Sequence, residues 1–366
     1  MFTDNDLQKL LHYQSSSPVL SVYLNTDPAE GNADAHKLRL RSMLKDVDLL
    51  EDVDAVLHYF DHEHPWSGRS AAVFSSARDA YFQAYPLAVP VRSRVRVMER
   101  PYVKPLVDLL DSYGGYGVAL VDKQGARLFY FHLGELIEQE GMVGEAVRRT
   151  KRGGGSQAPG RRGGAAGQTD YVDGVAERNL KEAVDFAVHF FAEKNVRRVL
   201  IGGAEENTAL FRALLPKAWQ SLVVGAFPMS MAAGHTEVLE RAMQVGREAE
   251  QRRELYLVDA IVTGAAKGRG GVLHLDDTLG AARQGRIQTL LIRDGYRAPG
   301  YCCLGCGYLS AMAFESCPFC GGQSEQITDA VEYTVRQVLQ SGGDVEVLPA
   351  GQPTPGFEHI GALLRY

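Results

Sequence analysis

The chain has 366 residues, of which 45% are hydrophobic and 23% charged, a composition typical of globular proteins. The formal net charge of −6 excludes a surface that binds nucleic acid non-specifically on all sides, so such binding would need local basic segments. The sequence contains no run of about 18 apolar residues, as a membrane-spanning helix would need. The opening MFTDNDLQKLL lacks the apolar core of a signal peptide, and we expect a cytoplasmic protein.

The first part of the chain, residues 1–100, predicts a small α/β domain. Its apolar segments predict strands at 19–24, 71–74 and 80–85, and residues 35–60 have helical periodicity. Three histidines of the segment HYFDHEH, His58, His62 and His64, lie close together in sequence. We interpret them as the polar end of a helix before Pro65 in preference to a metal site.

Residues 101–233 predict a central domain in which strands alternate with helices. Such alternation indicates a mixed or parallel sheet. The longest predicted helix, 172–194, places one broad apolar face at Val175, Leu180, Val184, Ala187, Val188 and Phe191. The remaining elements are a hairpin at 116–121 and 126–131, strands at 136–140, 196–202 and 222–227, and a helix at 206–215.

A basic, glycine-rich loop at 148–168 interrupts the central domain. Its sequence RRTKRGGGSQAPGRRGGAAGQ holds six Arg or Lys residues and no acid. Glycines let the backbone adopt positive φ and approach a ligand closely, and the cations would attract a polyanion such as RNA. A disordered linker between domains is the alternative interpretation. The cationic residues are Arg148, Arg149, Lys151, Arg152, Arg161 and Arg162.

Residues 234–366 predict a third α/β domain. Its helices are expected at 236–255, 277–284 and 327–340, and its strands at 272–275, 287–293, 344–348 and 361–366. The glycine-rich stretch 264–271 lacks the residue order of a nucleotide-binding phosphate loop. We expect it instead to touch RNA backbone through Lys267 and Arg269.

All five cysteines fall within the segment 302–322 of this third domain. Cys303, Cys306, Cys317 and Cys320 have the two-residue spacings of a zinc ribbon, in which four thiolates enclose one structural Zn²⁺. Glycines after the second cysteine of each pair suit the sharp turn. A site with four protein ligands is closed, so this zinc would be structural. Cys302 is the spare cysteine, a possible substitute ligand.

The order of these features resembles the archaeal and eukaryotic class I peptide chain release factors and Pelota. The chain has a basic glycine loop before a long helix, then a cysteine knuckle, and it ends in GALLRY after GFEHI. The opening strand VLSVYLN is similar to the bacterial branch of that superfamily. The resemblance implies three α/β domains, the last of L7Ae-like αβα type with an inserted zinc knuckle.

In that family a Gly-Gly-Gln loop enters the peptidyl-transferase centre, where the ester of peptidyl-tRNA is hydrolysed. The resemblance therefore implies that Gln157 orients water and that Gly153, Gly154 and Gly155 give backbone access. Ser156, also a candidate residue of this site, stands between the glycines and the glutamine, where the family's pattern has no such residue. Gln168 is a second candidate glutamine. The literal Gly-Gly-Gln at 321–323 is fixed to the cysteine knuckle, and we interpret it as structural.

The expected function is that of a translation factor acting on peptidyl-tRNA in the ribosomal A site. The ribosome and tRNA are the expected partners, and a translational GTPase is a further candidate. The family's Asn-Ile-Lys-Ser decoding motif has no match here, so stop-codon specificity is not expected. Two alternatives remain open: a non-catalytic hibernation factor that binds the ribosome, and an endonuclease that cleaves tRNA on stalled ribosomes.

Overall fold

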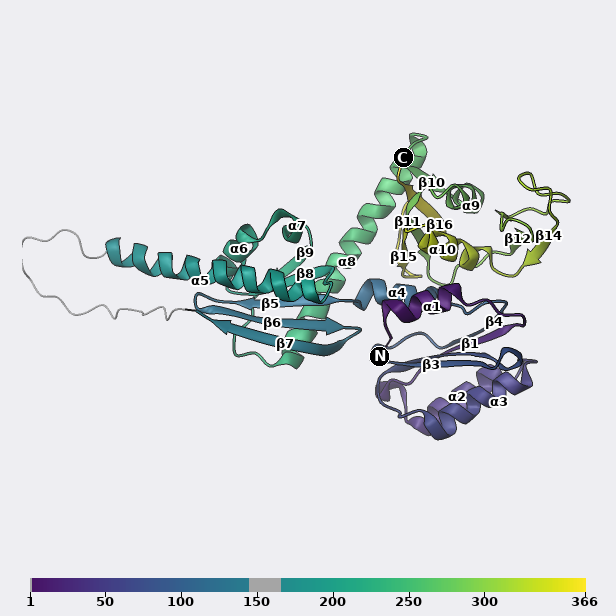
Figure 1. Cartoon of the computed structure of the whole chain (residues 1–366), viewed down its shortest axis with the longest axis horizontal. Helices are drawn as coiled ribbons and strands as arrows, with labels where there is room; N and C mark the ends of the chain where they lie inside the picture. Colours follow the sequence, from purple (N-terminus) through teal and green to yellow (C-terminus); the bar gives the residue numbers. More distant parts are fainter. Residues whose placement is uncertain (1, 145–165) are drawn as a thin grey trace, which may run out of the picture. The chain divides into compact units, whose positions relative to one another are not determined.

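A computed structural model of the chain describes residues 2–144 and 166–366 (Figure 1). Helices and strands are both present along the whole described chain, which confirms the predicted α/β class. The chain forms two compact units: one holds the residues up to Ser112 together with Gln251–Tyr366, and the other is Tyr113–Glu250. Within the described ranges, no helix combines the length and apolar character needed to cross a membrane.

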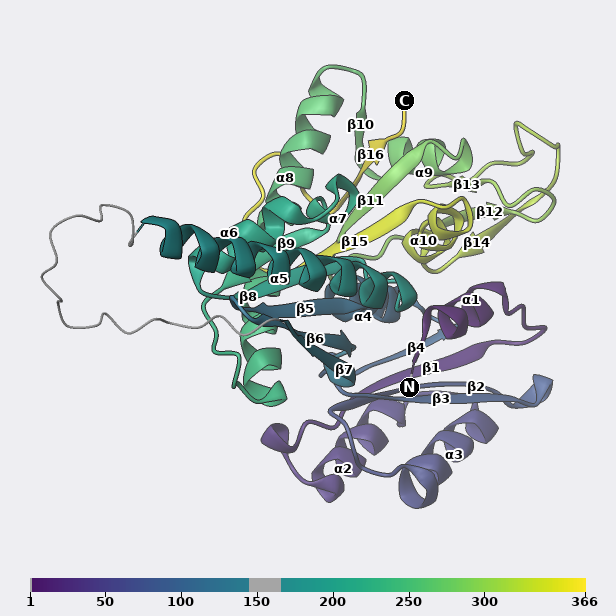
Figure 2. The same ribbon diagram turned by 60° about the vertical axis from the view of Figure 1, so that its left-hand side comes forward.

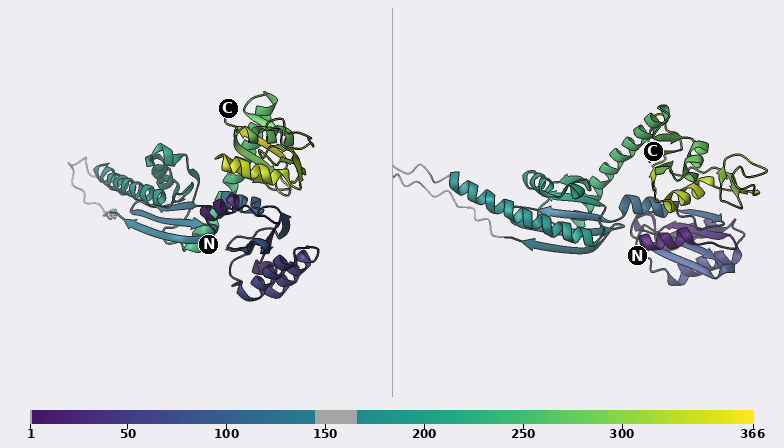
Figure 3. Two further views of the ribbon diagram at one scale, coloured as in Figure 1. Left: turned by 45° about the vertical axis from the view of Figure 1, so that its right-hand side comes forward. Right: turned by 45° about the horizontal axis from the view of Figure 1, so that its top comes forward.

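The first segment folds into a four-stranded antiparallel sheet of order β3-β2-β1-β4. Helices α2 and α3 pack on one face of it, which Figures 1 and 3 show from different sides. The predicted strands are confirmed. The edge strand β4 and the first helix, α1, which Thr3 and Asp6 cap reciprocally, were not predicted. The elements are α1 (Asp4–His12), β1 (Val19–Asn25), α2 (Ala33–Leu44), α3 (Leu50–His58), β2 (Ser70–Ser76), β3 (Tyr81–Leu87) and β4 (Arg94–Met98).

The histidine segment continues helix α3 as a π-helical turn at Tyr59–Glu63. His58 and His62 are exposed, whereas His64 is buried with its Nδ1 3.2 Å from the Tyr59 hydroxyl. Burial lowers the pKa of His64 to about 4. The helical turn ends at Glu63 with His64 as its C-terminal cap, directly before Pro65, so the interpretation as a helix end is confirmed.

The last segment forms a second four-stranded sheet, of order β10-β16-β11-β15. The C-terminal half of α8 packs on one face through Leu257, Val258 and Ile261, and α9 and α10 lie on the other (Figure 2). This is the predicted αβα layering. The elements are α8 (His235–Ala266), β10 (Gly271–Leu273), α9 (Leu275–Arg283), β11 (Ile287–Arg293), α10 (Ala330–Gln340), β15 (Asp344–Leu348) and β16 (Ile360–Leu364).

Buried polar contacts join this second sheet to the beginning of the chain. Arg336 of α10, only 2% exposed, donates hydrogen bonds to the carbonyl oxygens of Leu10 and Leu11 at 3.3 and 3.0 Å. Glu332, one turn earlier, accepts a 3.0 Å hydrogen bond from the Val103 amide. Segments distant in sequence therefore form one unit.

The central unit is built on a five-stranded mixed sheet of order β7-β6-β5-β8-β9. Strand β8 runs parallel to both β5 and β9, and the pairs that involve β6 are antiparallel, as the alternating pattern predicted. The elements are α4 (Lys104–Tyr113), which leads into the unit, β5 (Tyr116–Val121), β6 (Gly125–His132), β7 (Glu135–Val143), α5 (Ala166–Glu193), β8 (Arg198–Gly203), α6 (Glu205–Leu214), α7 (Lys217–Gln220) and β9 (Val223–Phe227).

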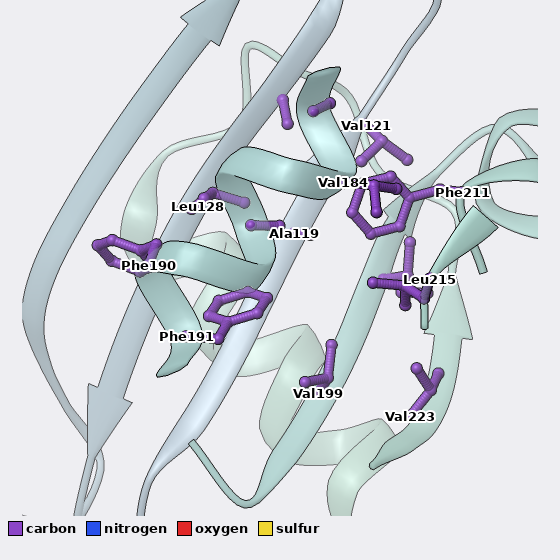
Figure 4. Close-up of a cluster of buried hydrophobic side chains, with 14 of the residues drawn as sticks. Ala119, Val121, Leu128, Val184, Phe190, Phe191, Val199, Phe211, Leu215 and Val223 are labelled. Atoms are coloured by element: carbon purple, nitrogen blue, oxygen red, sulfur yellow. The ribbon is translucent and has the colours of Figure 1, made fainter. Parts of the chain in front are cut away.

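Both faces of this central sheet are covered by helices. The apolar face of α5 is the predicted one, and it packs with α6 against Ala119 and Val121 (Figure 4). The neighbouring residues Val118 and Leu120 point to the opposite face, where the first half of α8 covers them. Helix α5 begins six residues earlier than predicted, at Ala166 in place of residue 172.

Candidate metal centre and nucleic-acid interface

The four predicted metal ligands come together beside a small three-stranded sheet made of β12 (Gly300–Cys303), β13 (Leu309–Ser310) and β14 (Ser324–Ile327). The sulfurs of Cys303, Cys306, Cys317 and Cys320 all lie within 4.8 Å of one another. The Cys303–Cys320 and Cys306–Cys317 pairs are 3.4 and 3.6 Å apart. Four thiolates at about 2.3 Å from a tetrahedral ion are about 3.8 Å apart, so this arrangement can hold one metal ion.

The two cysteine turns share one backbone geometry. The amide of Gly307 donates to the Cys303 carbonyl, and the amide of Gly321 donates to the Cys317 carbonyl, both at 2.9 Å. These glycines have φ of +69° and +74°, which a residue with a Cβ rarely adopts. The sequence expectation for both glycines is thereby confirmed.

The electrostatics of the cluster also suit a cation. The backbone N–H of Tyr308 lowers the pKa of Cys306 to about 6. The N–H of Gly322 lowers the pKa of Cys320, but the sulfurs of Cys303 and Cys306 raise it by more, and the net shift is upward to about 12. Four thiols at these distances therefore ionise together only when a bound cation compensates their charge.

Cys302 is not part of this group. It precedes Cys303 on strand β12, so the two side chains point to opposite faces. Its half-buried side chain packs against a small apolar cluster of Leu279, Leu309, Ile327 and Ala330. The possible role of Cys302 as a substitute ligand is therefore wrong for this arrangement.

The candidate catalytic and RNA-binding residues of the basic glycine loop lie outside the described residues. This holds for Gly153, Gly154, Gly155, Ser156, Gln157, Arg148, Arg149, Lys151, Arg152, Arg161 and Arg162. The flanking elements are described: β7 ends at Val143, and α5 begins at Ala166 and includes position 168. The loop thus connects an edge strand of the central sheet to the 28-residue helix α5.

The base of the loop is held by a polar contact that the sequence did not indicate. Asn179 of α5 is 1% exposed, and its amide donates a 3.0 Å hydrogen bond to the Lys123 carbonyl in the β5–β6 turn. Gly144, the last described residue before the loop, donates to the Gln124 carbonyl at 2.6 Å. A Cβ at Gly144 would collide with the Asn179 amide. Asparagine inside a helix is a weak sequence signal, but its position at mid-helix on the buried face could have drawn attention to it.

The chain's central region matches a known family. Residues 101–247 match the family described as bacterial archaeo-eukaryotic release factor family 10. This part of the chain is similar to the bacterial archaeo-eukaryotic release factors. The resemblance predicted from the order of the motifs is thereby confirmed, and the matched range contains both the loop and its two flanking elements.

Individual relatives of this release-factor-like chain are distant. The peptide chain release factor subunit 1 of Methanocaldococcus jannaschii is 23% identical over 311 residues, which cover 72% of this chain and 69% of the relative. A structure of ribosome-bound archaeal Pelota and ABCE1 aligns with TM-score 0.40 and 14% identity, over 100% of this chain and 94% of that one. Dom34 of S. cerevisiae, which interacts with Hbs1, aligns with TM-score 0.39 and 11% identity, over 81% and 79%.

The literal Gly-Gly-Gln of this release-factor-like chain lies in the second cysteine turn. The Gly322 carbonyl accepts a 2.9 Å hydrogen bond from Cys317, and the Gln323 carbonyl accepts a 3.0 Å hydrogen bond from Leu304. A Cβ at Gly322 would stand 3.1 Å from the Cys303 sulfur. The three residues thus serve the packing of the cysteine turns.

The stretch 264–271 is not a phosphate loop in the structure. Its first three residues complete helix α8, which ends at Ala266, and a short turn leads into β10. Lys267 and Arg269 are exposed on that turn.

Proposed function

We propose that this chain is a translation factor that enters the ribosomal A site and releases the peptide from peptidyl-tRNA by ester hydrolysis. The observation that carries the proposal is the family match over residues 101–247, which contains the basic glycine loop and both of its flanking elements. The distant similarity to an archaeal peptide chain release factor over 311 residues supports the same role.

The loop supplies the residue types that this reaction needs. The amide of Gln157 would orient a water molecule toward the ester carbonyl, and Gly153–Gly155 would let the backbone approach the tRNA end. Water adds to the carbonyl carbon, the ester bond breaks, and the tRNA 3′ hydroxyl leaves with a proton. The cations from Arg148 to Arg162 would pair with RNA phosphates.

The described residues fix the segments on either side of the loop. Asn179 and Gly144 fix the point where the loop leaves the sheet, so that the catalytic segment would be presented from a rigid base. We propose Zn²⁺ as the ion held by Cys303, Cys306, Cys317 and Cys320, because four thiolates at these distances match its tetrahedral preference. Four protein ligands leave no open position, so this zinc would be structural.

The test uses stalled ribosomes that carry labelled peptidyl-tRNA, with a sense codon in the A site. Wild type, Gln157→Ala and the matched control Gln168→Ala are added, and gels report both the peptide and the tRNA 3′ end. We expect free peptide and intact tRNA with wild type and Q168A, and release slowed at least a hundredfold by Q157A. Loss of release in Q168A alone would move the catalytic role to Gln168.

Two other outcomes would replace the proposal. Peptide that remains attached to a shortened tRNA would identify a nuclease. If wild type and both variants bind ribosomes but cleave neither the peptide ester nor the tRNA, the chain would be a hibernation-type factor. Release only when a stop codon occupies the A site would contradict the sequence-based expectation that the chain lacks stop-codon specificity. Added translational GTPase should accelerate release if, as the resemblance implies, such a protein delivers the factor.

A further inference from the structure

One end of the C-terminal sheet gathers cationic side chains from three turns. The amide of Leu364 donates to the Gly270 carbonyl at 2.9 Å, and the amide of Arg365 donates to the Arg286 carbonyl at 2.8 Å. These bonds bring together the turn before β10, the turn before β11 and the residues after β16. We call the resulting surface the basic edge, and it consists of Lys267, Arg269, Arg283, Arg286 and Arg365.

The cations of the basic edge have no Asp or Glu partner among the described residues, although some of them make other polar contacts. Arg286 donates a 3.0 Å hydrogen bond to the main-chain oxygen of Tyr366, and Arg283 donates to the Cys306 sulfur at 3.8 Å. Across residues 2–144 and 166–366, no ion pair joins any of the five to an Asp or Glu side chain. Elsewhere in the same unit, Arg69, Arg94 and Arg297 each pair with an aspartate. Asp344 is exposed where β15 begins, at this end of the sheet, but it is not bridged to the edge. The exposed charges of Lys267, Arg269 and Arg365, in a chain of net charge −6, favour an external anion.

Aromatic rings accompany two of these arginines. The Arg286 guanidinium lies 5.7 Å from the ring centre of Tyr366, which is 75% exposed. Arg283, at the end of α9, lies 3.3 Å from the ring centre of Phe319, which is 58% exposed beside the cysteine cluster. Guanidinium groups together with open aromatic faces are the surfaces on which unpaired nucleobases stack.

We propose that the basic edge is an RNA-binding surface: its cations contact the sugar–phosphate backbone, and Tyr366 and Phe319 stack unpaired bases. The identity of this RNA as ribosomal rests on the proposed function. The basic edge is a different candidate RNA-binding region from the basic glycine loop, because the two belong to different compact units. Aromatic rings among the cations favour RNA over an acidic peptide.

The test measures the affinity of the full-length protein for a fluorescently labelled RNA hairpin with an unpaired loop, by anisotropy at several salt concentrations. The variant K267E/R269E is compared with R212E/K217E, which changes the net charge equally at exposed positions of α6 and α7. We expect K267E/R269E to bind about tenfold more weakly, with a salt slope smaller by one to two. The control should stay within about twofold of wild type. Y366A should bind about fivefold more weakly with an unchanged salt slope.

Three results would overturn the proposal. K267E/R269E could bind as tightly as wild type, both double variants could lose affinity equally, or an acidic peptide could compete with the hairpin at equal charge. Circular dichroism and zinc content should confirm that each variant is folded. The loop variant R161E/R162E separates this inference from the proposed function. Loss of hairpin binding in that variant alone would support the loop and reject the basic edge, whereas absence of peptide release by wild type would reject only the proposed function.

Discussion

The central sheet and the cysteine knuckle fix their shapes by different physical means. The central sheet buries an apolar layer on each face, including Phe191 and Phe211 at 1% and 0% exposure. The knuckle has strands of four, two and four residues and leaves Leu304, Met312 and Phe319 between 58% and 73% exposed. So small a sheet cannot exclude enough water to hold itself together. Burial of apolar side chains therefore stabilises the central sheet, whereas metal coordination by the four thiolates is suited to stabilise the cysteine knuckle.

The largest effect is expected when one metal ligand is removed from the cysteine knuckle. Cys317→Ser should abolish stoichiometric zinc binding, because a structural site contributes about 10–16 kcal/mol only with its full ligand set. Zinc per chain is measured by mass spectrometry after dialysis. Cys302→Ser is the matched control and should keep one zinc per chain, since its sulfur lies outside the cluster. Retention of zinc by C317S would contradict the assigned ligand set.

The reverse experiment removes a buried aromatic ring from α6, the helix that packs with α5 on the central sheet. Phe211→Ala should lower the free energy of unfolding of the central unit by about 3–5 kcal/mol, through lost burial and the cavity left behind. Trp219, whose ring centre lies 6.2 Å from that of Phe191, reports this unit in urea titrations of a W66F background. Zinc content should not change. Val143→Ala, at an 85% exposed position, should have almost no effect; an equal loss in both variants would mean that the cluster does not stabilise the unit.

The N-terminal sheet allows a further test, because the buried side chains beside it include the titratable ring of His64. The pKa of His64 is about 4 in the folded chain, below its ordinary value of 6.5, so the unfolded chain binds the proton first as the pH falls. Stability should therefore fall between about pH 6.5 and pH 4, by roughly 3 kcal/mol in total.

Urea titrations at several pH values measure this loss through Trp66, whose ring centre is 5.0 Å from that of His64, in a W219F background. His64→Gln should remove most of the loss. Burial raises the pKa of Glu332 to about 7, which stabilises the fold at low pH and opposes the His64 effect. The difference between wild type and H64Q isolates His64, and parallel pH profiles for the two proteins would refute the assignment.

The sequence predicted the elements that have clear periodicity. The apolar face of α5 and the hairpin of β5 and β6 follow from spacing alone. The metal ligands followed from the two cysteine pairs, because each pair lies within a few residues of the chain. These features depend on neighbours in sequence, which a single chain displays directly.

The features that were missed depend on contacts between distant residues or on short segments. Strands β12–β14 are too short to show a period. Strand β4 alternates arginine and valine, and its charge obscured that alternation. The roles of Asn179 and Arg336 follow from partners more than 50 residues away, which no local pattern contains.

The order in which segments form the two units has a consequence for synthesis. The central unit is continuous in sequence, whereas the first unit needs both the residues up to Ser112 and those from Gln251 onward. During translation, the carbonyls of Leu10 and Leu11 can accept their hydrogen bonds only after Arg336 has been synthesised. At ordinary elongation rates this takes on the order of tens of seconds. The first α/β segment therefore emerges with its α10-binding surface uncovered, and this surface stays open to aggregation until α10 has been synthesised.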